Sequence, residues 1–124
     1  MKLLDTTIAI DYLRGRQEAV ELLENLLRSE RAVSSELVRF ELYAGATDEE
    51  LGTLAAFLSA LDWLPVTTEI SETAGLLARR YRASFSSTDD IDYLIAASAI
   101  VADADLLTTN IRHYPMLEGL EPPY

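Results

Sequence analysis

Cysteine is absent from this chain of 124 residues, and histidine and lysine occur once each. Without cysteine the chain cannot form disulfides, thiolate zinc sites or iron–sulfur clusters, and it has no cysteine nucleophile. Long apolar runs are absent from its start, because the run at Leu3 and Leu4 ends at Asp5. We therefore expect neither a signal peptide nor a membrane anchor, and a cytoplasmic location.

Linkers, internal repeats and low-complexity stretches are also absent. A content of 49% apolar and 25% charged residues is typical of a globular protein, and this length suffices for one hydrophobic core. We predict a single domain over residues 1–124. The proline-rich residues 120–124 are expected to be a loose tail.

Positive charge is scarce, because 10 lysine and arginine residues face 21 acidic residues and the net charge is −11. Such a surface repels nucleic acid at long range and favours cations or a basic partner. A protein with this charge can act on nucleic acid only if the electrostatic potential is positive at the site of action, and a bound divalent metal ion supplies that positive charge. The one tight basic cluster is Arg79, Arg80 and Arg82, which is either the solvated face of a helix, the interpretation we favour, or a substrate contact.

Short apolar segments alternate with amphipathic ones along the whole chain. The short segments, at 1–4, 31–34, 63–66 and 106–109, predict strands, and Pro65 places the third at the periphery of a sheet. Helices are predicted near 8–13 and at 18–28, 35–43, 48–61, 69–81 and 91–102. This order predicts an α/β fold with a parallel sheet, whose functional crevice lies beyond the carboxyl ends of the strands.

Two polar residues follow strands and therefore reach that crevice. Asp5 follows the first strand, where it is either a site residue or the N-cap of the next helix. Asn110 follows the last strand, where it is either a site residue or a turn residue. Asp103 and Asp105 precede the last strand and are expected at the opposite end of the sheet.

Two further acids occupy positions that are predicted to be buried. Glu41 falls on the apolar side of its helix, so it needs a metal ion, a proton or an arginine partner. Asp92 lies in the first turn of the most apolar helix, where Thr88, Asp89 and Asp90 supply the alternative capping groups. The lone His113 is more readily a packed or surface residue than an acid catalyst.

Asp5, Glu41, Asp92 and Asn110 would together form a pocket of hard oxygen ligands. Carboxylates that share one pocket repel each other unless a cation neutralises them. Oxygen ligands suit Mg²⁺ or Mn²⁺ and suit zinc poorly. Ions of this kind activate water and stabilise the leaving oxygen in phosphodiester hydrolysis.

Four segments resemble the PIN-domain ribonucleases, and most closely the VapC-type toxins of toxin–antitoxin pairs. They read LLDT at residues 3–6, VRFELYAG at 38–45, DYLIAA at 92–97 and LLTTNIRHY at 106–114, in the family's order. The resemblance implies a three-layer α/β/α sandwich with a short-stranded, mostly parallel sheet. It also implies an endoribonuclease that depends on Mg²⁺ or Mn²⁺.

The same resemblance assigns roles to residues of this chain. Asp5, Glu41 and Asp92 match the metal-binding acids, and Asn110 matches a fourth position that is often aspartate. Thr6, Asp90 and Thr109 are possible supporting residues. A homodimer, a basic VapB-type antitoxin and a transfer or ribosomal RNA substrate are also implied.

Three other interpretations stay open at this point. A housekeeping RNA-processing nuclease would use the same residues without an antitoxin. A non-catalytic acidic scaffold would bind a basic protein without a metal ion. A phosphoacceptor domain of the receiver type needs a lysine after its last strands, and the only lysine here is Lys2.

Overall fold

The computed structural model describes all residues, 1–124, and contains one sheet of four parallel strands in the order β3-β2-β1-β4. The strands are β1 (Lys2–Leu4), β2 (Ala32–Ser35), β3 (Asp62–Leu64) and β4 (Asp105–Leu107). β1 and β2 occupy the centre of the sheet, and β3 is an edge strand that stops before Pro65. The predicted parallel sheet with a peripheral third strand is therefore confirmed.

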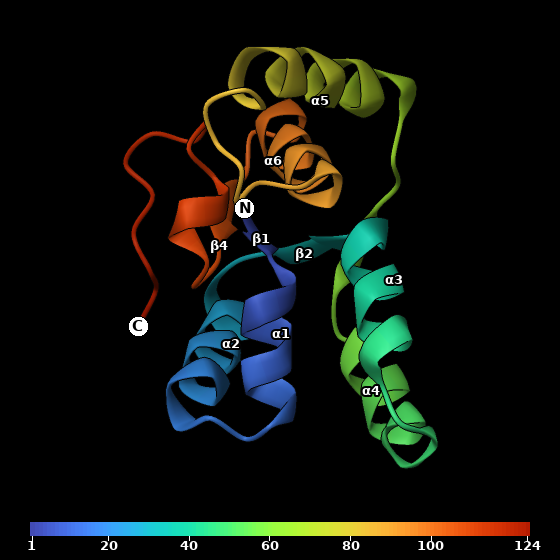
Figure 1. Cartoon of the computed structure of the whole chain (residues 1–124). Helices are drawn as coiled ribbons and strands as arrows, with labels where there is room; N and C mark the ends of the chain where they lie inside the picture. Colours follow the sequence, from blue (N-terminus) through green and yellow to red (C-terminus); the bar gives the residue numbers. More distant parts are fainter.

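Helices cover both faces of this sheet. They are α1 (Thr6–Leu13), α2 (Gln17–Ser29), α3 (Glu36–Gly45), α4 (Leu51–Leu58), α5 (Thr68–Tyr81) and α6 (Asp90–Val101), with 3-10 turns η1 (Asp48–Glu50) and η2 (Ile111–His113). α5 and α6 lie above the sheet, whereas α1 to α4 lie below it (Figure 1). The expected three-layer α/β/α sandwich is confirmed.

α6 lies between α5 and the sheet (Figure 1), as its apolar surface requires. Seven of its residues are buried, among them Tyr93, Ile95 and Ala96. They pack in one core with Leu3 and Leu106 of the central strands. The first turn of α6 is thereby held at the carboxyl end of the sheet.

The bounds of the elements differ from the prediction by one to three residues, and the ends of β4 and α4 and the cap of α6 illustrate the differences. β4 ends at Leu107, and beyond it the backbone amides of Thr109 and Asn110 donate to the side-chain hydroxyls of Thr7 and Thr108, at 3.1 and 3.0 Å. α4 begins after the turn η1 and ends at Leu58. Thr88 does not cap α6, since its hydroxyl donates to the His113 carbonyl at 2.9 Å and Asp89 is the N-cap.

None of the helices is both long and apolar enough to cross a membrane. Residues 120–124 form no helix or strand. The hydroxyl of Tyr124, at their end, donates to an Asp11 carboxylate oxygen on α1 at 2.6 Å, and Arg16 lies over the Tyr124 ring.

Candidate active site

Asp5 lies at the end of β1 and is the N-cap of α1. Its backbone amide donates to the Leu107 carbonyl at 2.9 Å, which joins it to the end of β4. One carboxylate oxygen accepts from the Thr6 amide at 2.8 Å, and the other accepts from the Thr108 hydroxyl at 2.6 Å. The side chain is only 4% exposed, and this burial raises its pKa, while the two hydrogen bonds oppose the rise.

Glu41, on α3, lies opposite Asp5 and is held there by Thr6. The Thr6 hydroxyl donates to Glu41 Oε1 at 2.6 Å, and Thr6 directly follows Asp5. No arginine pairs with Glu41, so the structure does not contain the ion pair that would explain its position. Burial raises the pKa of Glu41, and the nearby charges of Asp5 and Asp89 raise it further.

Asp92 lies in the first turn of α6 and is 8% exposed. It forms a reciprocal cap with Asp89, in which each side chain accepts from the other's amide at 3.0 Å. Oδ2 of Asp92 also lies 3.1 Å from Nδ1 of His113. Burial raises the pKa of Asp92 to about 6, and the charges of Asp89 and Asp5 contribute to the rise.

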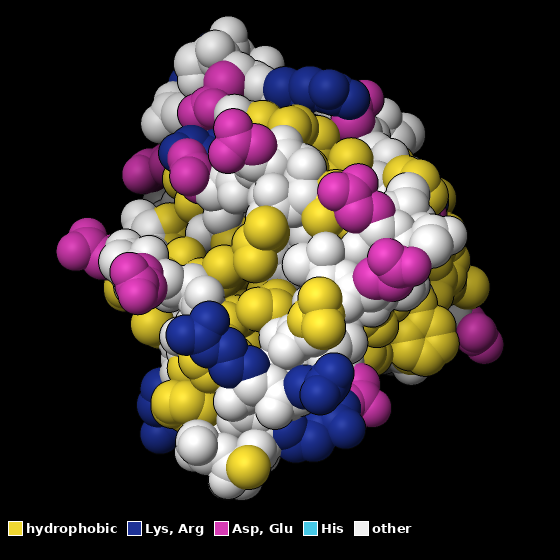
Figure 2. Space-filling view, turned by 90° about the horizontal axis from the view of Figure 1, so that it is seen from above, with side chains coloured by type: hydrophobic (Ala, Val, Ile, Leu, Met, Phe, Trp, Pro, Cys, Tyr) yellow, Lys and Arg dark blue, Asp and Glu magenta, His cyan; other side chains and the backbone are white.

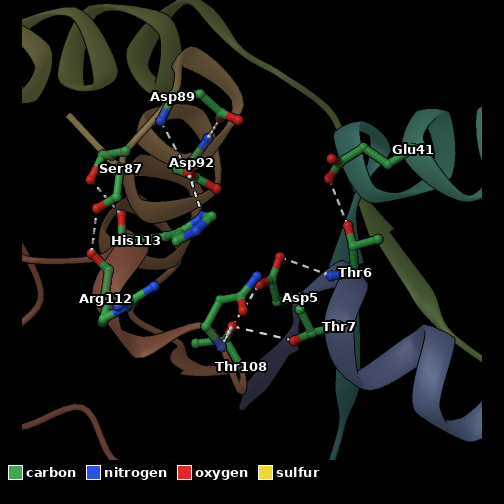
Figure 3. Close-up of polar contacts among 12 residues, drawn as sticks. Asp5, Thr6, Thr7, Glu41, Ser87, Asp89, Asp92, Thr108, Arg112 and His113 are labelled. Atoms are coloured by element: carbon green, nitrogen blue, oxygen red, sulfur yellow. Dashed lines mark hydrogen bonds and ion pairs between the residues drawn. The ribbon is translucent and has the colours of Figure 1, made fainter.

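The three carboxylates point toward one shared space at the carboxyl end of the sheet (Figure 3). Asp5 approaches it from the end of β1, Asp92 from α6 and Glu41 from α3. As they stand, no three acidic or histidine side chains form a closed cation-binding cluster. The carboxylates nevertheless influence one another, because the charge of Asp5 raises the pKa of both Glu41 and Asp92.

The other residues that the sequence singles out lie differently. Asn110 is exposed, and its backbone amide donates to the Thr108 hydroxyl at 3.0 Å. Asp90 is exposed and forms an ion pair with Arg82, so it is not directed at the shared space. Thr109 contacts Thr7 through its backbone, whereas Thr6 bridges Asp5 and Glu41.

Three residues that the sequence reasoning did not place in the site contact it or adjoin it. Thr108 binds Asp5, and His113, which is partly exposed, contacts Asp92. The hydroxyl of Tyr114 is buried beside the Asp5 carboxylate; this burial raises its pKa, and the charges of Asp5, Asp92 and Glu41 raise it further. The position of Thr108 after β4 is a signal for its role, but nothing in the sequence pairs residues 113 and 114 with the acids.

Replacing Thr108 with valine is expected to lower the free energy of unfolding at pH 7 by about 2 kcal/mol. The change keeps the shape of the side chain but removes the hydroxyl that donates to the buried Asp5 carboxylate. The same hydroxyl accepts a hydrogen bond from the Asn110 amide, and this bond is lost too. Urea unfolding measures the loss. Thr109→Val is the matched control, since the Thr109 hydroxyl makes no hydrogen bond in the structure, and an equal loss there would contradict the role of Thr108.

Comparisons with known proteins agree with this architecture. The model of the PIN domain family matches residues 2–115. The chain is 58% identical over 125 residues to Ribonuclease VapC19 of Mycobacterium tuberculosis, with 100% of both chains covered.

Solved structures extend the likeness to the fold. A toxin–antitoxin complex from Klebsiella pneumoniae superposes with a TM-score of 0.85 at 26% identity, over 100% of this chain and 98% of that chain. VapBC2 from Rickettsia felis, bound to a DNA fragment from its promoter, superposes with a TM-score of 0.83 at 25% identity, over 96% of this chain and 94% of that chain. The likeness spans all three layers of the sandwich.

Proposed function

The chain belongs to the PIN-domain family and is a ribonuclease of the VapC toxin type. We propose that Asp5, Glu41 and Asp92 together bind one or more Mg²⁺ or Mn²⁺ ions, and that these ions are required for RNA cleavage. One observation carries the proposal: three carboxylates from distant parts of the chain face one space, and burial raises the pKa of each. A divalent cation would offset both the burial of these charges and their mutual repulsion.

The chemistry of the donor set fits Mg²⁺ or Mn²⁺. The groups that face the shared space are carboxylate oxygens, with one imidazole at Asp92 and no sulfur. The buried hydroxyl of Tyr114 adds a neutral oxygen group beside the Asp5 carboxylate. Side-chain rotation of Glu41, which one hydrogen bond holds, would bring its oxygens closer to Asp5.

The surrounding residues of the chain prepare these ligands. Thr108 and Thr6 hold the Asp5 carboxylate in one orientation, so little conformational freedom is lost when it acts as a ligand. Asn110, at the mouth of the site, would contact the substrate or a water through its neutral amide. When bound, the metal ion supplies positive charge for the phosphate and lowers the pKa of a water molecule.

We further propose the biological partners. The relatives of known structure are toxin–antitoxin complexes, and the net charge of −11 suits a basic VapB-type antitoxin whose arginine covers the carboxylates. A homodimer, a cytoplasmic location and a transfer or ribosomal RNA substrate complete the proposal.

Removing divalent metal is expected to stop RNA cleavage completely, because Asp5, Glu41 and Asp92 repel phosphate when no cation is bound. The measurement is the cleavage rate of total transfer RNA and of ribosomal RNA by the purified chain, after dialysis against EDTA. Mn²⁺ or Mg²⁺, added back, should restore the rate. Full activity in EDTA would contradict the proposed function.

A further inference from the structure

Five of the nine arginines form no ion pair, namely Arg14, Arg28, Arg79, Arg80 and Arg112, and three of these five lie in or near the chain between α5 and the site. Lys2, Arg16, Arg31, Arg39 and Arg82 all form ion pairs. Arg79, Arg80 and Arg112 are exposed and form none. Arg79 and Arg80 lie in the last turn of α5, one residue before Arg82 begins the loop to α6.

Contacts connect Arg82 and Arg112 to the Asp92 side of the site, and Arg79 and Arg80 precede Arg82 by two or three residues. Arg82 pairs with Asp90 and lies 6.0 Å over the ring of Tyr93, next to Asp92. From the same loop, the Ser87 hydroxyl donates to the Arg112 carbonyl at 3.3 Å. Arg112 adjoins His113, which contacts Asp92, and Figure 3 shows both beside Ser87. We call Arg79, Arg80, Arg82 and Arg112 the arginine rim.

An exposed aromatic ring lies in the same loop. Phe85 is 39% exposed, and the centre of its ring lies 5.9 Å from the centre of the Tyr81 ring. Tyr81 itself stands between Arg80 and Arg82 in the sequence. Several basic side chains gather at the lower edge of the face seen in Figure 2, with one acidic group beside them, whereas most acidic side chains lie over the rest of this face. Cations combined with an exposed ring form the type of surface that binds single-stranded nucleic acid.

Building on the proposed function, we propose that the arginine rim binds the phosphates of single-stranded RNA beside the cleaved bond, and that one base stacks on Phe85. Salt screens charges beyond about 10 Å, so a phosphate at the rim senses these arginines more strongly than the acids elsewhere on the surface. Two acids follow the loop that carries Arg82: Asp90 forms an ion pair with Arg82, and Asp89 caps α6. A basic antitoxin does not suit this surface, since it would meet like charges.

Arginines in the last turn of a helix also stabilise the helix dipole, and a matched control separates this role from RNA binding. Arg28 lies in the last turn of α2, is exposed, and contacts only Asn25. α2 lies below the sheet, away from α5 (Figure 1). Arg28→Ala therefore removes the same charge from the same helix position without touching the rim.

The test measures binding without cleavage. The full chain carries Asp5→Asn, and its binding of a fluorescein-labelled single-stranded RNA is followed by anisotropy in Mg²⁺ at several salt concentrations. Arg79→Ala combined with Arg80→Ala should raise the Kd at least about tenfold and lower the slope of log Kd against log salt by about 1.4, since each lost phosphate contact contributes about 0.7. Phe85→Ala should raise the Kd about tenfold and leave the slope unchanged. Arg28→Ala should change neither value.

Two results would contradict the proposed role of the arginine rim. If the Arg79, Arg80 double variant binds RNA like Arg28→Ala, or if the chain with an intact rim does not bind RNA, the proposal about the rim is wrong. Cleavage by the Asp5→Asn chain would instead contradict the proposed function. Circular dichroism checks that each variant is folded.

Discussion

Replacing Asp5 with asparagine is expected to lower RNA cleavage by about a thousandfold or more, which corresponds to about 4 kcal/mol of transition-state stabilisation. Asparagine keeps the shape of the side chain and one acceptor oxygen for the Thr6 amide. It removes the negative charge that lies between the other two carboxylates. The measurement is the cleavage rate in saturating Mn²⁺, together with growth of a bacterium that expresses the variant, which should be normal.

Asp105→Asn is the matched control for this experiment. Asp105 is also an acid of the central sheet region, but it begins β4 at the opposite end and pairs with Lys2 at 2.9 Å. Its replacement should leave the cleavage rate unchanged. A similar rate for Asp5→Asn and the wild type would show that Asp5 does not take part in the reaction.

Asp92 should make the metal-free protein less stable as the pH rises. Its pKa in the folded chain is about 6, above the ordinary value of 3.8, so between these values the folded state holds a proton that the unfolded state has lost. The resulting stabilisation is present below 3.8 and is lost as the pH rises through about 6. Asp92→Asn has no such group, and at pH 7 it should exceed the wild type in stability by up to about 3 kcal/mol.

Urea unfolding in EDTA, from about pH 5 to about pH 8, measures this difference. The advantage of Asp92→Asn should grow by about 1.4 kcal/mol across that range. Glu50→Gln is a control in which stability should fall and not rise. Hydrogen bonds from Thr47 lower the pKa of Glu50, so the charged form of Glu50 stabilises the fold and its loss destabilises it. An advantage of Asp92→Asn that does not change with pH would contradict the raised pKa.

The layers of the fold could be predicted from the sequence because hydrophobic periodicity records burial. Residues 91–102 form the most apolar of the predicted helices, and α6 is buried between α5 and the sheet. Boundaries were less accurate where side chains replace backbone partners. Thr108 and Thr109 have strand-like residue types, yet β4 ends at Leu107, and the amides of Thr109 and Asn110 donate to side-chain hydroxyls.

The candidate site could be predicted only in part, because strand ends and helix faces specify direction but not contact. Glu41 was identified by its place on the apolar face of α3, although the Thr6 hydroxyl that binds it lies 35 residues away in sequence. His113 reaches Asp92 through the turn η2, which the bond from Thr88 to the His113 carbonyl holds in place. Such contacts depend on the packing of loops, and a single sequence contains no periodic signal for them.

Calorimetric titration with Mn²⁺ tests most directly whether Asp5, Glu41 and Asp92 share a cation. We expect measurable binding by the wild type, and a loss of at least about tenfold in affinity for each of Asp5→Asn, Glu41→Gln and Asp92→Asn. Asp105→Asn should bind as the wild type does. Unchanged Mn²⁺ affinity in all three site variants would contradict the shared site and the chemistry that depends on it.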